Sequence, residues 1–188
     1  MIHHITDDLT TMHVDAIVNA ANVGLVGGAG LCGQIHDAAG PELDKECKKL
    51  NDCQRGEAKI TGGYKLPDKY VIHTVGPVYG QHGGSEPEIL YSCYYESMRL
   101  ANEHKLTSIA FPYISTGIYS YPLEEAKPIA EQALSDFLED FSNTSIKDIY
   151  LVTYSDSVNM NKQSPFMLKP LPDETAEQFK RRLKEQIK

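Results

Sequence analysis

Hydrophobic and polar positions divide the chain into two kinds of segment. Short runs that are almost wholly apolar predict buried strands, because a strand covered on both faces loses the alternation of a half-exposed one. Five such runs are DAIVNA (15–20), AKITGGY (58–64), YVIHTVGP (70–77), TSIAFPYI (107–114) and IKDIYLVTY (146–154).

In the other kind of segment, apolar residues recur every three or four positions, as they do on one face of a helix. The longest of these segments spans 85–105 and has Leu90, Cys93 and Tyr94 on the recurring positions. Pro128 is expected to cause a local disturbance in the helix predicted over 121–141. The other predicted helices are GQIHDAAG (33–40), PELDKECKKL (41–50) and YPLEEAKPIAEQALSDFLEDF (121–141).

Strands and helices alternate along most of the chain, which predicts a three-layer α/β/α domain around a central sheet. A length of 188 residues suits one domain with a full core. After Asp156 the chain becomes polar and proline-bearing, and it ends in an amphipathic pattern with Phe179 and Ile187 on one stripe. We therefore expect a domain over 1–156. Over 157–188 we expect a linker and a terminal helix that packs on the domain or extends from it as an interaction tail.

The net charge of −8 disfavours a broad electrostatic surface for nucleic acid. No apolar run reaches the 18 residues of a membrane span, and the start MIHHITDD lacks the basic and apolar regions of a signal peptide. Cys32, Cys47, Cys53 and Cys93 form no C-x-x-C pair and are expected to be reduced thiols, with a Cys47–Cys53 disulfide as the less favoured alternative. These features predict a cytoplasmic protein without membrane or nucleic-acid partners.

Two of the predicted strands lead into loops whose composition suits a phosphate group. GGAG (27–30) lies between the strand at 15–20 and a helix expected to begin near Cys32, and STG (115–117) follows the strand at 107–114. Glycines let several backbone N–H groups converge on an anion, and a helix N-terminus adds positive potential. Neither loop contains the lysine of a P-loop. Because ligands of open α/β sheets bind outside the carboxyl ends of strands, the two loops predict a bound diphosphate.

Five segments together resemble the macrodomain family, most closely its ADP-ribosyl-hydrolase and O-acetyl-ADP-ribose deacetylase branch. They are VDAIVNAAN (14–22), GGAGLCGQIHDAAG (27–40), GEAKITGGYKLP (56–67), YVIHTVGP (70–77) and FPYISTGIYSYP (111–122). The resemblance implies a mixed, mostly parallel six-stranded sheet between helices. It also implies that ADP-ribose or an O-acyl derivative binds in a cleft, with mono-ADP-ribosylated proteins as the protein partners.

The resemblance further implies roles for single residues. Asp8 would accept a hydrogen bond from the adenine amino group, Leu9 would add a backbone contact, and Tyr154 would stack near the adenine. Asn22 would bind the distal ribose, whereas Asn19 is expected to be structural. The residues that would surround the phosphates are Gly28, Ala29, Gly30 and Leu31 in the first loop and Ser115, Thr116, Gly117, Ile118 and Tyr119 in the second.

Cys32 departs from the family pattern, because the hydrolase branch carries at this position an aspartate that is thought to position or activate water. An ordinary thiol is mostly neutral at pH 7 and forms weak hydrogen bonds, so we expect Cys32 to be neutral and not a nucleophile. Losing a positioned base usually slows a reaction about a hundred- to ten-thousand-fold, so binding should survive where turnover is slow. Ala29 replaces a family glycine, which is tolerable if its φ stays negative.

His36 lies one helical turn after Cys32 on the same face. It is expected either to orient the site or to pack in the core, and it joins Asn22 and Cys32 as the candidate catalytic set. Cys32 and His36 could ligate zinc as a pair, but a zinc site needs three or four ligands. The sequence does not place His73 or His82 to complete such a site, so we predict no metal and no cofactor.

These observations support two functions of different class. The first is an enzyme that hydrolyses an ester bond to ADP-ribose, either in O-acetyl-ADP-ribose or on a mono-ADP-ribosylated acidic side chain. The second is a reader module that binds ADP-ribose without turnover, and Cys32 motivates it. A third hypothesis, RNA or phosphate processing, is weaker because the chain is acidic and lacks basic aromatic clusters.

Overall fold

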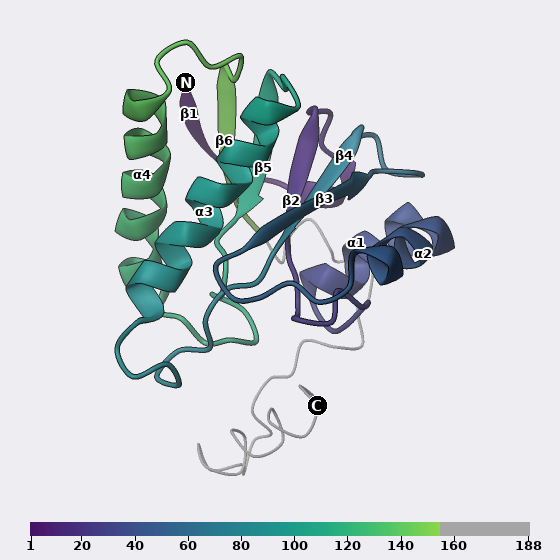
Figure 1. The fold of residues 1–188 in the computed structure, drawn as a ribbon, viewed down its shortest axis with the longest axis horizontal. Coiled ribbons are helices and arrows are strands. Elements are labelled where there is room, and N and C mark those ends of the chain that lie inside the picture. The colour runs from purple at the N-terminus through teal and green to yellow at the C-terminus, as the bar shows by residue number, and fades with distance from the viewer. Residues whose placement is uncertain (155–188) are drawn as a thin grey trace.

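The structure, a computed structural model, describes residues 1–154, which form a six-stranded sheet flanked by helices (Figure 1). The strands are β1 (Ile2–Thr6), β2 (Ala16–Ala20), β3 (Ala58–Gly62), β4 (Tyr70–Thr74), β5 (Ser108–Pro112) and β6 (Asp148–Thr153). The helices are α1 (Leu31–Ala39), α2 (Pro41–Leu50), α3 (Glu86–Glu103) and α4 (Leu123–Asp140), together with the 3-10 helix η1 (Leu9–Thr11).

The strand order is β1-β6-β5-β2-β4-β3, and every neighbouring pair is parallel except β4 with β3. This arrangement confirms the mixed, mostly parallel sheet, and all five apolar runs form strands. The apolar pattern missed β1, whose sequence is IHHIT. β1 pairs only with β6 at the edge of the sheet and keeps partly exposed side chains, so it needs no continuous apolar run.

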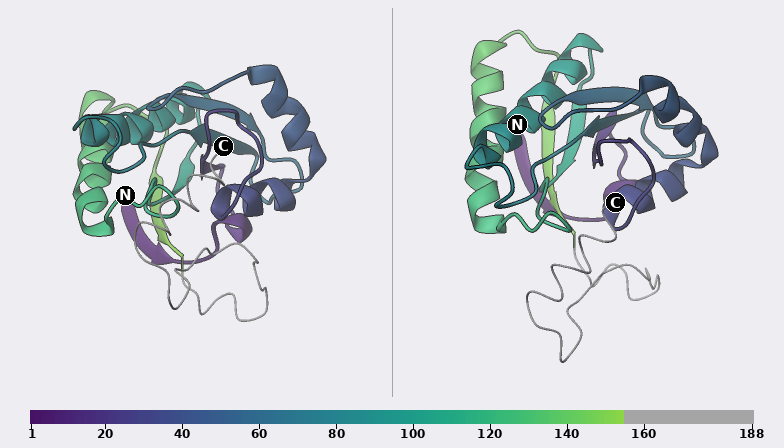
Figure 2. Two further views of the ribbon diagram at one scale, coloured as in Figure 1. Left: turned by 90° about the horizontal axis from the view of Figure 1, so that it is seen from below. Right: turned by 60° about the horizontal axis from the view of Figure 1, so that its bottom comes forward.

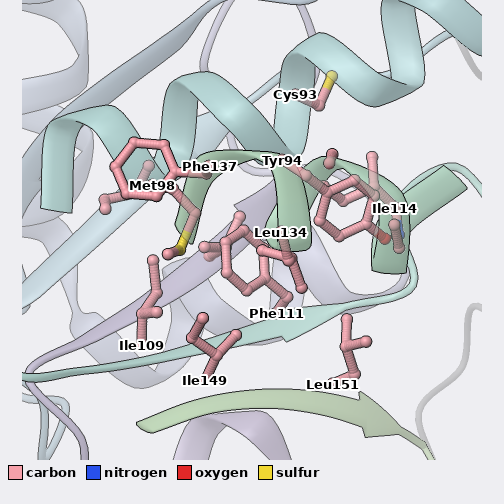
Figure 3. Packing of buried hydrophobic residues seen from close by; sticks show 14 of the residues in the cluster. Cys93, Tyr94, Met98, Ile109, Phe111, Ile114, Leu134, Phe137, Ile149 and Leu151 are labelled. Carbon is pink, nitrogen blue, oxygen red and sulfur yellow. The ribbon is translucent and has the colours of Figure 1, made fainter. Parts of the chain in front are cut away.

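The helices cover the two faces of the sheet as separate layers (Figure 2). On one face α3 and α4 pack against a core that includes Tyr94, Phe111 and Phe137 (Figure 3). On the other face α1 and α2 contribute Ile35 and Leu43 to a second buried cluster beside β2 and β4. The three-layer α/β/α architecture is therefore confirmed.

The pairing between β2 and β5 is short. These strands pair only at Ala16–Ile109 and Ile17–Ala110, whereas β2 pairs with β4 along its full length. The chain connections also diverge here, because the segment after β2 leads to β3 and β4 while β5 and β6 lie on the other side. Such a divergence is where open α/β sheets bind their ligands.

α1 begins at Leu31, one residue before Cys32 and so close to the expected start, because Gly30 has a φ of +66° and turns the chain directly into the helix. One local expectation, the disturbance at Pro128, needs correction. α4 continues unbroken through Pro128, its sixth residue, although the proline cannot donate the hydrogen bond that this position would make to the Glu124 carbonyl.

The linker and terminal helix expected over 157–188 lie outside the described residues, so the domain boundary stays a prediction. Within 1–154, no helix is long and apolar enough to cross a membrane.

Candidate functional site

Four parallel strands, β1, β6, β5 and β2, end at the same edge of the sheet, and each is followed by predicted site residues. Asp8 follows β1, Tyr154 follows β6, and residues 115–119 and 22–31 follow β5 and β2. Three interstrand spacings separate β1 from β2, a span of about 14 Å. The edge therefore brings together residues from both ends of the described chain.

The segment 22–30, called the glycine loop below, is held by its own first residue. The Asn22 carboxamide accepts a hydrogen bond from the Val26 N–H (3.1 Å) and donates one to the Val26 carbonyl (2.7 Å). Leu25, with a φ of +51°, is buried beneath the loop. In this structure the Asn22 side chain thus shapes the loop, a role that the sequence analysis did not assign to it.

The glycine loop leads into α1 without a capping side chain. Ala29 is not among the residues with positive φ, so the condition for replacing a glycine there is met. Among residues 1–154, no acceptor pairs with the N–H groups of Gly28, Ala29 and Gly30. These N–H groups and the uncapped first turn of α1 form one continuous set of donors.

The segment 115–120, called the serine loop below, closes on itself after β5. The Tyr121 N–H donates to the Ser115 carbonyl (2.9 Å) and the Ser120 N–H donates to the Gly117 carbonyl (2.9 Å). Ser115 has a φ of +66°, unusual for a residue with a side chain. In the described part of the chain, the N–H groups of Gly117 and Ile118 have no acceptor.

The two loops lie against each other. A methyl group on Gly30 would be 3.7 Å from Cδ1 of Ile118. The Arg55 guanidinium lies 5.2 Å from the centre of the Tyr119 ring and donates a hydrogen bond to the Gly76 carbonyl, which braces the serine loop from the side of β4. Two sets of unpaired N–H groups therefore meet where β2 and β5 part.

At the other end of the edge, β1 and β6 carry the two residues expected beside adenine. The Asp7 N–H donates to the Thr153 carbonyl (3.2 Å), which brings Asp8 and Tyr154 to adjacent strand ends. The Oδ1 atom of Asp8 caps η1 by accepting from the N–H (2.9 Å) and the hydroxyl (2.7 Å) of Thr10. Its Oδ2 atom takes no part in the cap.

Cys32 lies in the first turn of α1 and is 7% exposed. Its thiol donates a hydrogen bond to the Val26 carbonyl at 3.6 Å, and the Asn19 Nδ2 approaches its sulfur at 3.6 Å. The thiol therefore acts as a donor toward the glycine loop, unlike a carboxylate, which can only accept. Asn19 is fully buried, in agreement with its expected structural role.

His36 is buried on α1, and its Nδ1 donates to Oδ1 of Asp44 on α2 at 2.6 Å. Burial opposes the charging of the imidazole, but the nearby Cys32 and Asp44 side chains outweigh burial and raise the pKa of His36. The Nε2 atom of His36 is buried and has no hydrogen-bond partner. His36 therefore packs in the core, which was one of its two expected roles. Its Nε2 atom nevertheless remains without a hydrogen bond.

His73, on β4, is a neighbour of His36 that local sequence patterns did not predict, because the two residues are distant along the chain. The His36 and His73 ring centres are 6.2 Å apart, and Cys47 Sγ lies 3.8 Å from His73 Nε2. Burial, and then the nearby His36, lowers the pKa of His73 to about 3, so His73 is neutral at physiological pH. Burial, followed by the field of Asp44, raises the pKa of Cys47 to about 11.

A surface hollow of about 280 Å³ lies elsewhere, between the ends of α3 and α4. It is lined by residues such as Asn102, Asp140 and Asn143, which precede β5 and β6. It therefore lies at the amino end of the strands, opposite the two loops, and plays no part in the candidate site.

Comparison with known proteins gives the same family on independent grounds. The Macro domain family model matches residues 18–130. Macro domain-containing protein CT2219 of Chlorobaculum tepidum is 52% identical over 158 residues, which are 83% of this chain and 90% of that protein. ADP-ribose glycohydrolase MACROD2 of Homo sapiens is 54% identical over 132 residues, which are 70% of this chain but 31% of that protein.

Solved structures agree with these sequence matches. A structure of the Oceanobacillus iheyensis macrodomain with ADP is 40% identical with a TM-score of 0.76, covering 81% of this chain and 83% of that chain. A Trypanosoma brucei macrodomain in complex with ADP-ribose is 41% identical with a TM-score of 0.76, covering 83% of this chain and 65% of that chain.

Proposed function

Because the chain belongs to the Macro domain family, we propose that it binds ADP-ribose at the carboxyl edge of its sheet and hydrolyses an ester-linked group from it. The substrates we propose are O-acetyl-ADP-ribose and mono-ADP-ribosylated acidic side chains. The observation that carries the proposal is the meeting of the glycine loop and the serine loop, whose unpaired N–H groups suit the diphosphate.

The rest of the ligand fits the same edge. The span of about 14 Å between β1 and β2 suits an extended molecule with a ring system at each end of a diphosphate. The Oδ2 atom of Asp8 is not used by the helix cap and can accept a hydrogen bond from the adenine amino group. The Tyr154 ring, at the adjacent strand end, would stack near the adenine. The distal ribose then lies over the glycine loop and Cys32.

Turnover should be slow in this chain. An aspartate at position 32 could accept a proton from water or orient it, whereas the Cys32 thiol donates to the Val26 carbonyl. The remaining contribution comes from holding the ester and water in place, which by itself accelerates a reaction. The alternative function, a reader without turnover, is favoured by this same hydrogen bond.

The test combines binding with turnover. Calorimetry with free ADP-ribose should give one site per chain, and no measurable heat would refute the proposal. Release of acetate from O-acetyl-ADP-ribose should be detectable and should rise about a hundredfold or more in Cys32→Asp. If the parent protein binds ADP-ribose but releases no acetate, the enzyme function is refuted and the reader function is supported.

A further inference from the structure

A buried group of metal-ligating side chains lies beneath the glycine loop, and the proposed diphosphate site does not use it. His36, Cys47 and His73 each bring one ligand atom into a group whose members all lie within 4.8 Å of one another. They come from α1, α2 and β4 and are 5%, 1% and 0% exposed. A ligand at this point would tie the two helices to the sheet.

One atom of this group has no partner in the protein. Since Nδ1 of His36 bonds Asp44, the free ring atom is Nε2, which is fully buried and unsatisfied. A buried polar atom without a hydrogen bond destabilises the folded state, and a ligand that binds it removes this cost. A side chain fixed by a carboxylate on one nitrogen and left open on the other matches the carboxylate–histidine–metal arrangement of natural metal sites.

A second residue orients His73 in a comparable way. The Asn19 carboxamide reaches His73 Nδ1 through Nδ2 at 3.1 Å, while its Oδ1 is buried without a partner. If the two ends of the carboxamide exchange places, Oδ1 accepts a hydrogen bond from the His73 Nδ1–H, and Nε2 is left with its lone pair. That lone pair accepts a hydrogen bond from the Thr61 hydroxyl at 2.8 Å and faces Cys47 Sγ at 3.8 Å. A metal ion at Nε2 would displace the Thr61 hydroxyl, which then donates to the Gly62 carbonyl at 3.2 Å.

The distances are close to those of a tetrahedral zinc site. Zinc bonds of about 2.0–2.3 Å to nitrogen and sulfur separate the ligand atoms by roughly 3.3–3.8 Å. The pair of Cys47 and His73 already meets this range, and the longest separation in the group must shrink by about 1 Å. A fourth ligand, and second sulfur, is at hand in Cys32, which lies one turn before His36 on α1. The Asn19 Nδ2 atom lies 3.6 Å from Cys32 Sγ and 3.1 Å from the His73 ring, so the Cys32 sulfur borders the same group.

We propose that His36, Cys47 and His73 bind a zinc ion, with Cys32 as the fourth ligand. Two imidazoles and two thiolates are a ligand set that zinc prefers. Binding forms two zinc–sulfur bonds and releases the two thiol protons to solvent, so affinity increases with pH. The site is closed and buried, which makes it structural: it fixes the first turn of α1 under the glycine loop. In the zinc-bound protein the Cys32 sulfur binds the ion instead of donating to the Val26 carbonyl, and the test below measures zinc without ADP-ribose.

The test uses the whole chain, reduced, incubated with Zn²⁺ and then desalted. Elemental analysis should give one zinc per chain, and Co²⁺ in its place should produce thiolate-to-cobalt absorption. Cys47→Ala should lose both signals. Cys93→Ala removes another buried cysteine, on α3 in the opposite core, and should keep them.

A milder variant guards against loss of folding. Asp44 is about half exposed and its one hydrogen bond to the group is to His36, so Asp44→Asn should fold and bind zinc about 10- to 100-fold more weakly. Cys32→Ser should reduce the cobalt–thiolate absorption by about half. Absence of zinc from the parent protein, or equal binding in Cys47→Ala and Cys93→Ala, would overturn the proposal. Unchanged absorption in Cys32→Ser would remove Cys32 as the fourth ligand.

Discussion

A methyl group on Gly33 would lie 2.0 Å from the carbonyl oxygen of Gly28. The glycine loop therefore rests directly on the first turn of α1, and only a residue without a side chain fits there. We predict that Gly33→Ala lowers the free energy of unfolding by about 1–3 kcal/mol, since the backbone must move apart. ADP-ribose affinity should fall at least tenfold because the loop N–H groups lose their alignment. Denaturant unfolding and calorimetric titration measure the two effects.

The matched control for that variant is Gly117→Ala. No atom lies within 4 Å of a methyl group on Gly117, and its φ is not positive. The alanine should leave the free energy of unfolding within about 0.5 kcal/mol of the parent value. Equal losses of stability in Gly33→Ala and Gly117→Ala would contradict the close approach of Gly28 to Gly33.

Gly117→Glu should separate binding from folding. The open space in front of Gly117 accepts the larger side chain, so the thermal midpoint should stay near that of the parent. The carboxylate would occupy the space in front of both loops and repel the diphosphate, so ADP-ribose binding should be lost. Parent-like affinity in a folded Gly117→Glu protein would remove the serine loop from the ligand site.

Asn22→Ala removes both hydrogen bonds that close the glycine loop onto Val26. We expect the free energy of unfolding to fall by about 1–2 kcal/mol and ADP-ribose affinity to fall about tenfold or more. Asn143→Ala, an exposed asparagine at the other end of the sheet, serves as the control and should change neither. Calorimetry showing full affinity for Asn22→Ala would mean that the loop keeps its shape without the carboxamide.

Stability should also depend on pH through Asp68. This carboxyl is 3% exposed, and burial raises its pKa to about 6, against the opposing hydrogen bond from the Val14 N–H. The folded state favours the protonated carboxyl. The contribution of Asp68 to the free energy of unfolding is therefore complete below about pH 4 and is lost as the pH rises through 6. Integrated over that window, the loss is on the order of 2–3 kcal/mol.

Asp68→Asn tests this dependence because the amide keeps an acceptor for Val14 and cannot ionise. The difference in unfolding free energy between variant and parent should shift in favour of the variant by that amount between pH 4 and pH 7. Urea titrations across this range measure it. A constant difference would show that Asp68 ionises in the folded protein as it does in the unfolded chain.

The sequence predicted the layers and the two loops because both depend on local patterns. Buried parallel strands are continuously apolar, and helices show their period within a few turns, so most of the elements and their order along the chain could be derived. The edge strand β1 was missed because its sequence, IHHIT, shows neither pattern. Its partner β6 lies at the other end of the described residues, with Ile2 paired to Ile149.

The neighbours of His36 were beyond the reach of local patterns. His73 is on the same face as Asn19 because β2 and β4 pair in that register, and Cys47 reaches it only because α2 folds back over β4. The role of Asn22 was missed for another reason. A carboxamide that suits a sugar hydroxyl suits a backbone N–H and carbonyl equally well, so the residue type alone does not distinguish ligand from loop.

The early end of pairing between β2 and β5 has an evolutionary consequence. The opening for the nucleotide is made by main-chain geometry, which many side-chain replacements leave intact. In the function proposed above, turnover instead depends on the side chain at position 32, so we expect one substitution there to change turnover while recognition of the ligand is inherited unchanged.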